Sequence, residues 1–125
     1  YIALDRLDAT QLPDAPLISA ITLAELAAGP LVAHDEHERA VRTSQVQQAE
    51  AEFDPVPFDT AAARAFGRVS ASMRQRHRKV ASRSFDALIA AVALANGLPV
   101  YTCNPGDFEG IEGLEVVAVP LPEAD

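Results

Sequence analysis

The strongest constraint on the fold comes from residues 84–102, where a very apolar segment is followed by a glycine and a second apolar run. The stretch FDALIAAVALAN contains Asp86 as its only charged residue, Ser84 stands where a helix N-cap is favoured, and Gly97 is a typical C-terminal stop. Because a helix that is apolar on nearly all sides has to be surrounded by protein, we expect a central packed helix. The run LPVYT predicts a buried strand directly after it.

The rest of the chain alternates between strand-like and helix-like segments. Short apolar runs predict strands at 16–22, 53–58, 98–102 and 115–119, of which 53–58 is an edge strand because of its prolines. Helical spacing and capping residues predict helices at 1–7, 22–30, 35–52, 60–77 and 84–96. This alternation over 125 residues implies one domain, residues 1–125, of the α/β class, a three-layer α/β/α arrangement around a central, mainly parallel sheet.

The segment YTCNPGDF, residues 101–108, predicts a tight turn at the end of a strand. Proline presets the first central position of a turn, and Gly106 permits the positive φ of a type II turn. We therefore expect Asn104 and Asp107 to be folded together and aimed beyond the edge of the sheet. The same residues also fit an Asx turn that stabilises only its own backbone, and the stretch alone does not separate these two interpretations.

Two further acids are expected near the same edge, because polar groups converge where strands end and helices begin. Glu25 lies three residues after Thr22, a spacing that also fits a capping box, and Asp86 lies in a first helical turn, where an acid is favourable in any case. If Glu25, Asp86 and Asp107 meet, their charges need a cation or a shared proton. Hard oxygen ligands without paired His or Cys suit Mg²⁺ or Mn²⁺.

The charge of the chain is divided unevenly. The formal net charge of −8 argues against a protein that binds nucleic acid nonspecifically over its whole surface. Seven of the ten basic residues, however, lie between Asp59 and Asp86, a stretch without any acid. The last of them, Arg78, Lys79 and Arg83, could hold a phosphate backbone over the acidic site, although a charge run is also typical of a solvated helix face.

The composition also indicates where in the cell the protein is expected. The single cysteine, Cys103, cannot form an internal disulfide, which fits a reducing cytosol, so we expect a cytoplasmic protein. No apolar run approaches the roughly 20 residues of a membrane span, so no membrane partner is expected. The five phenylalanines are interpreted as core residues rather than as platforms for base stacking: Phe53, Phe58, Phe66, Phe85 and Phe108.

Three segments together resemble the PIN-domain ribonucleases, most closely the VapC-type toxins of bacterial toxin–antitoxin pairs: ISAITLAEL, SFDALIAAVALANGLPVYTCNPGDF and EGIEGLEVVAV. The resemblance implies that Glu25, Asp86 and Asp107 are metal-site residues and that Asn104 and Thr102 are their polar helpers. It also implies an Mg²⁺- or Mn²⁺-dependent endoribonuclease that cleaves tRNA, rRNA or mRNA, forms a homodimer and is silenced by a cognate antitoxin.

One feature of that family has no counterpart in the sequence. Its first strand ends in an acidic motif, whereas the opening residues Tyr-Ile-Ala-Leu resemble the segment just after it, so we expect the first strand and its aspartate to be missing from this chain. Asp5 is not assigned to that role, because no strand-like run precedes it. The missing acid motivates an alternative, a non-catalytic domain that keeps the fold and binds a protein partner.

Overall fold

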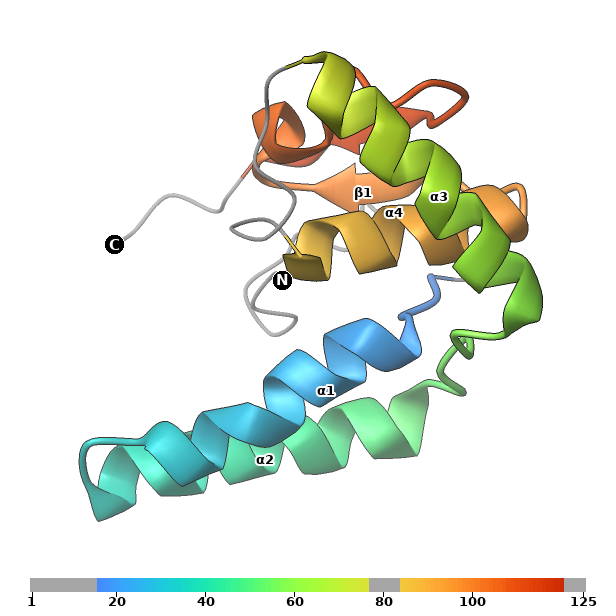
Figure 1. The fold of residues 1–125 in the computed structure, drawn as a ribbon. Coiled ribbons are helices and arrows are strands. Elements are labelled where there is room, and N and C mark those ends of the chain that lie inside the picture. The colour runs from blue at the N-terminus through green and yellow to red at the C-terminus, as the bar shows by residue number, and fades with distance from the viewer. Residues whose placement is uncertain (1–15, 77–83, 121–125) are drawn as a thin grey trace.

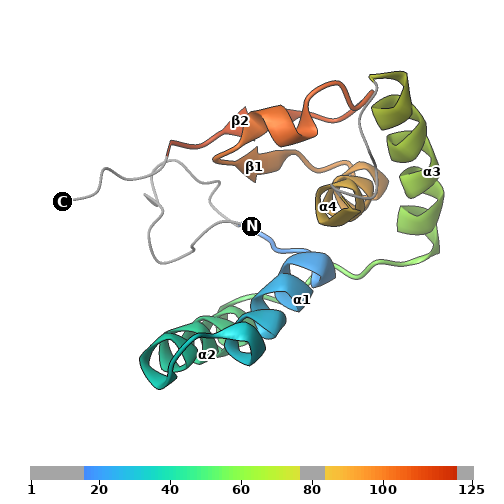
Figure 2. The same cartoon turned by 60° about the vertical axis from the view of Figure 1, so that its left-hand side comes forward.

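The computed structural model describes residues 16–76 and 84–120, and the expected helix at 1–7 lies outside these ranges. The elements in chain order are α1 (Ala20–Ala28), the 3-10 helix η3 (Gly29–Val32), α2 (Glu36–Glu52), α3 (Thr60–Gln75), α4 (Ser84–Ala95), β1 (Val100–Thr102), the 3-10 helix η5 (Pro105–Phe108) and β2 (Val116–Ala118). Figures 1 and 2 show α1 and α2 side by side as a hairpin that extends away from α3, α4 and the strands. In the part of the chain described, none of the helices combines the length and the apolar character needed to span a bilayer.

The two C-terminal strands confirm the expected parallel pairing. Strands β1 and β2 are parallel, with Val100 opposite Val116 and Thr102 opposite Ala118. The ladder continues at its end, where the backbone N–H of Val119 donates to the carbonyl of Thr102 (2.8 Å). Helices packed beside parallel strands agree with the predicted α/β class.

The prediction of strands at 16–22 and 53–58 was wrong in extent. Only a single parallel bridge joins these segments, between Ser19 and Val56, because α1 already begins at Ala20. The backbone N–H of Ala20 donates to the carbonyl of Val56 (2.8 Å), and that of Val56 donates to the carbonyl of Ile18 (2.9 Å). Pro55 and Pro57 have no N–H to extend the ladder on either side of Val56.

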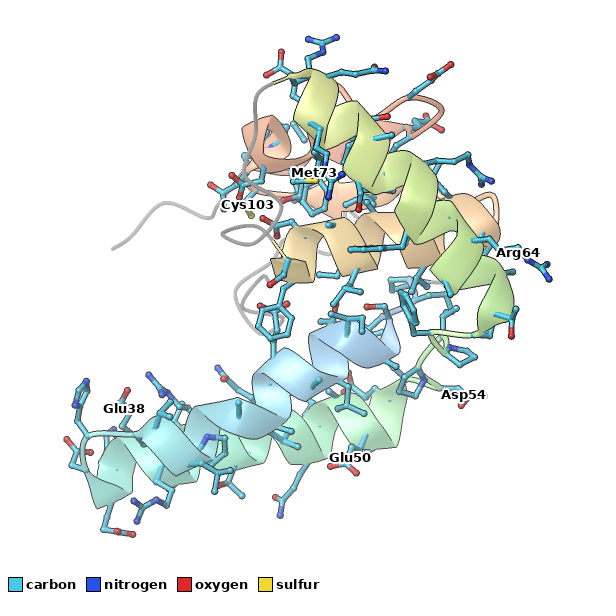
Figure 3. All side chains as sticks on the ribbon, in the orientation of Figure 1. Glu38, Glu50, Asp54, Arg64, Met73 and Cys103 are labelled. Atoms are coloured by element: carbon cyan, nitrogen blue, oxygen red, sulfur yellow. The ribbon has the colours of Figure 1, made fainter. Side chains whose placement is uncertain are left out.

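The main core lies between α3, α4 and the strands. One face of α3 is buried, through Ala62, Ala65, Val69 and Met73. It packs against the alanines of α4, and the absence of larger side chains there lets the two helices approach closely. Figure 3 shows Met73 between α3 and this layer, where the side chain is only 2% exposed. The predicted central position of the apolar helix is thus confirmed.

The hairpin of α1 and α2 has its own small core. Ile18, Leu26 and Ala49 are buried between the helices. At its far end, Arg42 forms an ion pair with Glu38 and donates to the carbonyl of Gly29 (2.9 Å), which ties η3 to α2. The hairpin therefore holds α1 as a rigid support for the side chains that face α4.

A matched pair of glycine substitutions tests the end of α4. The backbone of Gly97 has φ of 63°, and the N–H of Leu98 donates to the carbonyl of Ala93 (2.9 Å), as in a Schellman motif. Gly97→Ala is expected to lower the free energy of unfolding by about 1 kcal/mol, because a Cβ disfavours this conformation. Gly67→Ala, in an exposed and open position of α3, should instead raise it by about 0.5–1 kcal/mol. Urea unfolding measures both, and two effects of the same sign would refute the assigned cap.

Candidate active site

The candidate site lies where α4 begins and β1 ends. Figures 1 and 2 both show β1 running toward the side of the molecule on which α4 starts. Cys103, which directly follows β1, lies on this side in Figure 3. The predicted site residues Asp86, Thr102, Asn104 and Asp107 therefore belong to segments that meet at one edge, and Glu25 comes to it from α1, which packs against α4.

Glu25 is a predicted site acid with a buried carboxylate oxygen, and the charge of Asp86 acts on it. The Oε1 atom of Glu25 is buried and has no hydrogen-bond partner among the described residues. Burial raises the pKa of Glu25 above its ordinary value of 4.5, and the negative charge of Asp86 contributes to the same upward shift. The charge of Asp86 therefore acts on Glu25, while a site shared by the two carboxylates stays a prediction.

Glu25 does not close a capping box, contrary to one of its two predicted interpretations. The N-cap of α1 is Ser19, three residues before the expected Thr22. The N–H of Thr22 donates to Ser19 Oγ (3.0 Å), so the amide that Glu25 was expected to reach already has a partner. The sequence signal for this start was present, because Ser19 is itself an N-cap residue and precedes the apolar run. Glu25 therefore does not serve as the capping residue of α1, which was the alternative to a role in the site.

The turn at 104–107 exists, but it is not of type II. Pro105–Phe108 form a 3-10 helix, and the N–H of Asp107 donates to the carbonyl of Asn104 (3.0 Å). Gly106 does not have the positive φ that a type II turn requires. The Pro-Gly pair fits a helical turn as well as a type II turn, so it did not distinguish the two. The buried Thr102 Oγ1 accepts the N–H of Asn104 (3.0 Å) and so fixes where the turn leaves β1.

The complete set of predicted residues is not gathered into one cluster. Within residues 16–76 and 84–120, no three His, Cys, Asp or Glu side chains form a group that could hold a metal ion. The association of Asp107 with Glu25 and Asp86 therefore stays a prediction, as do the roles of Asn104 and Thr102. The basic residues predicted to contact RNA, Arg78, Lys79 and Arg83, lie outside the described residues.

Comparison with known proteins decides the family. The sequence model of the PIN domain matches residues 1–114. The chain belongs to the PIN domain family. This PIN domain is 34% identical over 114 residues to Ribonuclease VapC5 of Mycobacterium tuberculosis. The aligned segment covers 91% of this chain and 82% of that protein. It is 30% identical over 108 residues to Ribonuclease VapC of Rickettsia bellii, covering 86% of this chain and 79% of the relative.

Solved structures agree with this assignment. The crystal structure of VapBC-5 from Mycobacterium tuberculosis, a member of the VapBC family of toxin–antitoxin systems, matches this PIN domain with a TM-score of 0.81 and 35% identity, covering 94% of this chain and 91% of that one. The predicted resemblance to PIN domains of the VapC type is confirmed.

The residues present in this PIN domain fit a divalent cation. A buried carboxylate oxygen without a hydrogen-bond donor is costly in free energy, and a second carboxylate beside it increases the cost. A cation held by Glu25 and Asp86 would offset both penalties. Oxygen ligands of this kind are those that Mg²⁺ and Mn²⁺ prefer.

The raised pKa of Glu25 predicts a pH-dependent loss of stability in metal-free buffer. The folded PIN domain holds the Glu25 proton more tightly than the unfolded chain, in which the pKa is near 4.5. The contribution to the free energy of unfolding is therefore fully present below pH 4.5 and is lost as the pH rises through the raised pKa. Glu25→Gln removes this titration, so wild type should lose stability relative to the variant across that window. Urea unfolding of both proteins at a series of pH values measures the difference, and a constant difference would show that Glu25 is not perturbed.

Proposed function

We propose that this chain is the endoribonuclease toxin of a toxin–antitoxin pair and that it hydrolyses RNA phosphodiester bonds at a divalent-metal site. The observation that carries the metal site is the buried carboxylate oxygen of Glu25, which has no hydrogen-bond partner in the described part of the chain, together with the effect of the Asp86 charge on its pKa. The nuclease activity is supported by relatives that are named ribonucleases and that align over most of this chain.

In this proposal Glu25, Asp86 and Asp107 would hold Mg²⁺ or Mn²⁺. The bound ion supplies an activated water and stabilises the departing oxygen of the phosphodiester. Asp86 and Glu25 would bind the cation as deprotonated carboxylates. Glu25 therefore has to lose its proton before the cation binds. Thr102 holds the backbone of Asn104 in place. The exposed Asn104 side chain then orients the phosphate or the attacking water at the edge of the sheet.

The substrate and partners follow from charge and family. Arg78, Lys79 and Arg83 directly precede α4 in the sequence, and their charges would offset the repulsion between an acidic site and an RNA backbone. A protein antitoxin is the proposed partner, because the similar VapBC-5 structure belongs to a toxin–antitoxin system. A homodimer and a cytoplasmic location are part of the same proposal.

RNA cleavage with and without metal tests the proposal directly. Wild-type protein is incubated with total tRNA, rRNA and mRNA in Mg²⁺ or Mn²⁺, and in a chelator. Cleavage that appears with the ion and stops with the chelator supports the proposed function. Cleavage that continues in the chelator would remove the metal from the account, and a lack of cleavage of any RNA would favour a non-catalytic interaction domain.

A further inference from the structure

Phe85 departs from the predicted placement of the phenylalanines in the core. Phe85 is 49% exposed, whereas Phe108 is buried. The other three phenylalanines are partly buried and pack against one of the two cores: Phe53, Phe58 and Phe66. The prediction that all of them are core residues was therefore wrong for Phe85. An aromatic ring left in water forgoes the favourable free energy of burial, so its position calls for a reason.

Phe85 is the sequence neighbour of Asp86, a residue of the predicted site. Phe85 immediately precedes Asp86 in the first turn of α4, while the alanines of the same helix, among them Ala87, Ala90 and Ala91, face the core. Successive residues of a helix point in different directions around its axis, so Phe85 cannot occupy the same space as the carboxylate of Asp86. Phe85 is an exposed residue in the first turn of α4, next in sequence to Asp86.

The other large exposed apolar side chains of residues 16–76 and 84–120 lie elsewhere. Leu31 and Val32 are in η3, at the end of the α1–α2 hairpin, and Val41 is in α2. Leu17 precedes α1. Among these exposed residues, Phe85 alone is aromatic and alone adjoins a residue of the proposed metal site. An aromatic ring next in sequence to a residue of a proposed nuclease site is suited to contact a base of the substrate.

We propose that Phe85 is a base-stacking residue that positions a nucleotide beside the phosphate to be cleaved. This inference rests on the proposed nuclease function and adds a residue that positions its substrate. A phenyl ring stacks on the face of any unpaired base, so the contact depends little on the identity of the base.

Stacking can be measured without cleavage. The probe is a short single-stranded oligoribonucleotide that carries a fluorescent adenine analogue whose emission is quenched by stacking, and binding is recorded in chelator. Wild type should quench the probe on binding. Phe85→Leu, which keeps an apolar side chain, should lose the quenching and weaken binding about tenfold, whereas Phe85→Tyr should retain both. Leu31→Ala, which removes an exposed apolar side chain from the hairpin, is the matched control and should behave as wild type.

The outcomes separate this inference from the proposed function. Thermal unfolding should be unchanged in Phe85→Leu, since the ring is half-exposed, so weaker binding cannot be assigned to misfolding. An absence of quenching with wild type, or equal quenching and affinity in Phe85→Leu, overturns the stacking role while metal-dependent cleavage by wild type can still stand. Conversely, quenching that depends on Phe85 in a protein that cleaves no RNA would retain the stacking site and reject the nuclease.

Discussion

Asp86→Asn is expected to reduce metal-dependent RNA cleavage by about a hundredfold or more, because a carboxamide has no charge with which to balance the ion and is a poorer ligand. The substitution keeps the size of the side chain and its place in the first turn of α4. The loss should therefore appear in cleavage and not in folding. It is measured as the initial rate of cleavage in Mg²⁺ on the RNA that wild type cleaves fastest.

Asp54→Asn is the matched control for that experiment. Asp54, which Figure 3 labels, lies on an exposed loop between α2 and α3, so the same Asp-to-Asn change is made there far from the proposed site. Its variant should cleave at the rate of wild type. Undiminished cleavage by Asp86→Asn would remove the proposed role of this residue.

The helices could be predicted because their ends are set by local chemistry. Asp35 and Asp59 each accept a backbone N–H in the first turn of the helix that follows, at 2.7 Å and 3.0 Å. Gly97 takes the left-handed conformation that ends α4. These interactions involve residues close in the sequence, so they follow from residue type and spacing alone.

The start of α1 shows where local reasoning stops. Ser19 and Thr22 are both good N-cap residues, three positions apart, and either could begin a helix. The backbone bridge between Ser19 and Val56 decides between them, because it fixes Ser19 in an extended conformation at the point where the chain turns into α1. That pairing joins residues far apart in the sequence, and no local pattern predicts it.

The candidate site could be predicted in its components but not in its pairing. The acids were proposed from their positions near the ends of strands and helices, and their joint role stays a prediction. The burial of Glu25 and its interaction with Asp86 depend instead on how α1 packs against α4. The exposure of Phe85 has the same origin, since apolar residues occur on every side of α4 and the sequence does not say which of them the neighbouring elements leave uncovered.

Binding of Mn²⁺ is the second large effect that we expect. The wild-type protein should take up about one or two ions per chain in a saturable manner. Glu25→Gln and Asp86→Asn should each weaken this binding by about a hundredfold or more, because each removes a charged ligand from a partly buried space. Asp107→Asn should weaken it as well if Asp107 joins the pair, so the same titration tests the least supported ligand. Glu50→Gln, on the exposed side of α2 in Figure 3, provides the control.

The most direct test of a cation shared by Glu25 and Asp86 is isothermal titration calorimetry with Mn²⁺ on wild type, Glu25→Gln and Glu50→Gln. We predict saturable heat for wild type and Glu50→Gln and its loss in Glu25→Gln. Equal saturable binding in all of them, or none in wild type, would contradict a metal site built on the buried carboxylate of Glu25.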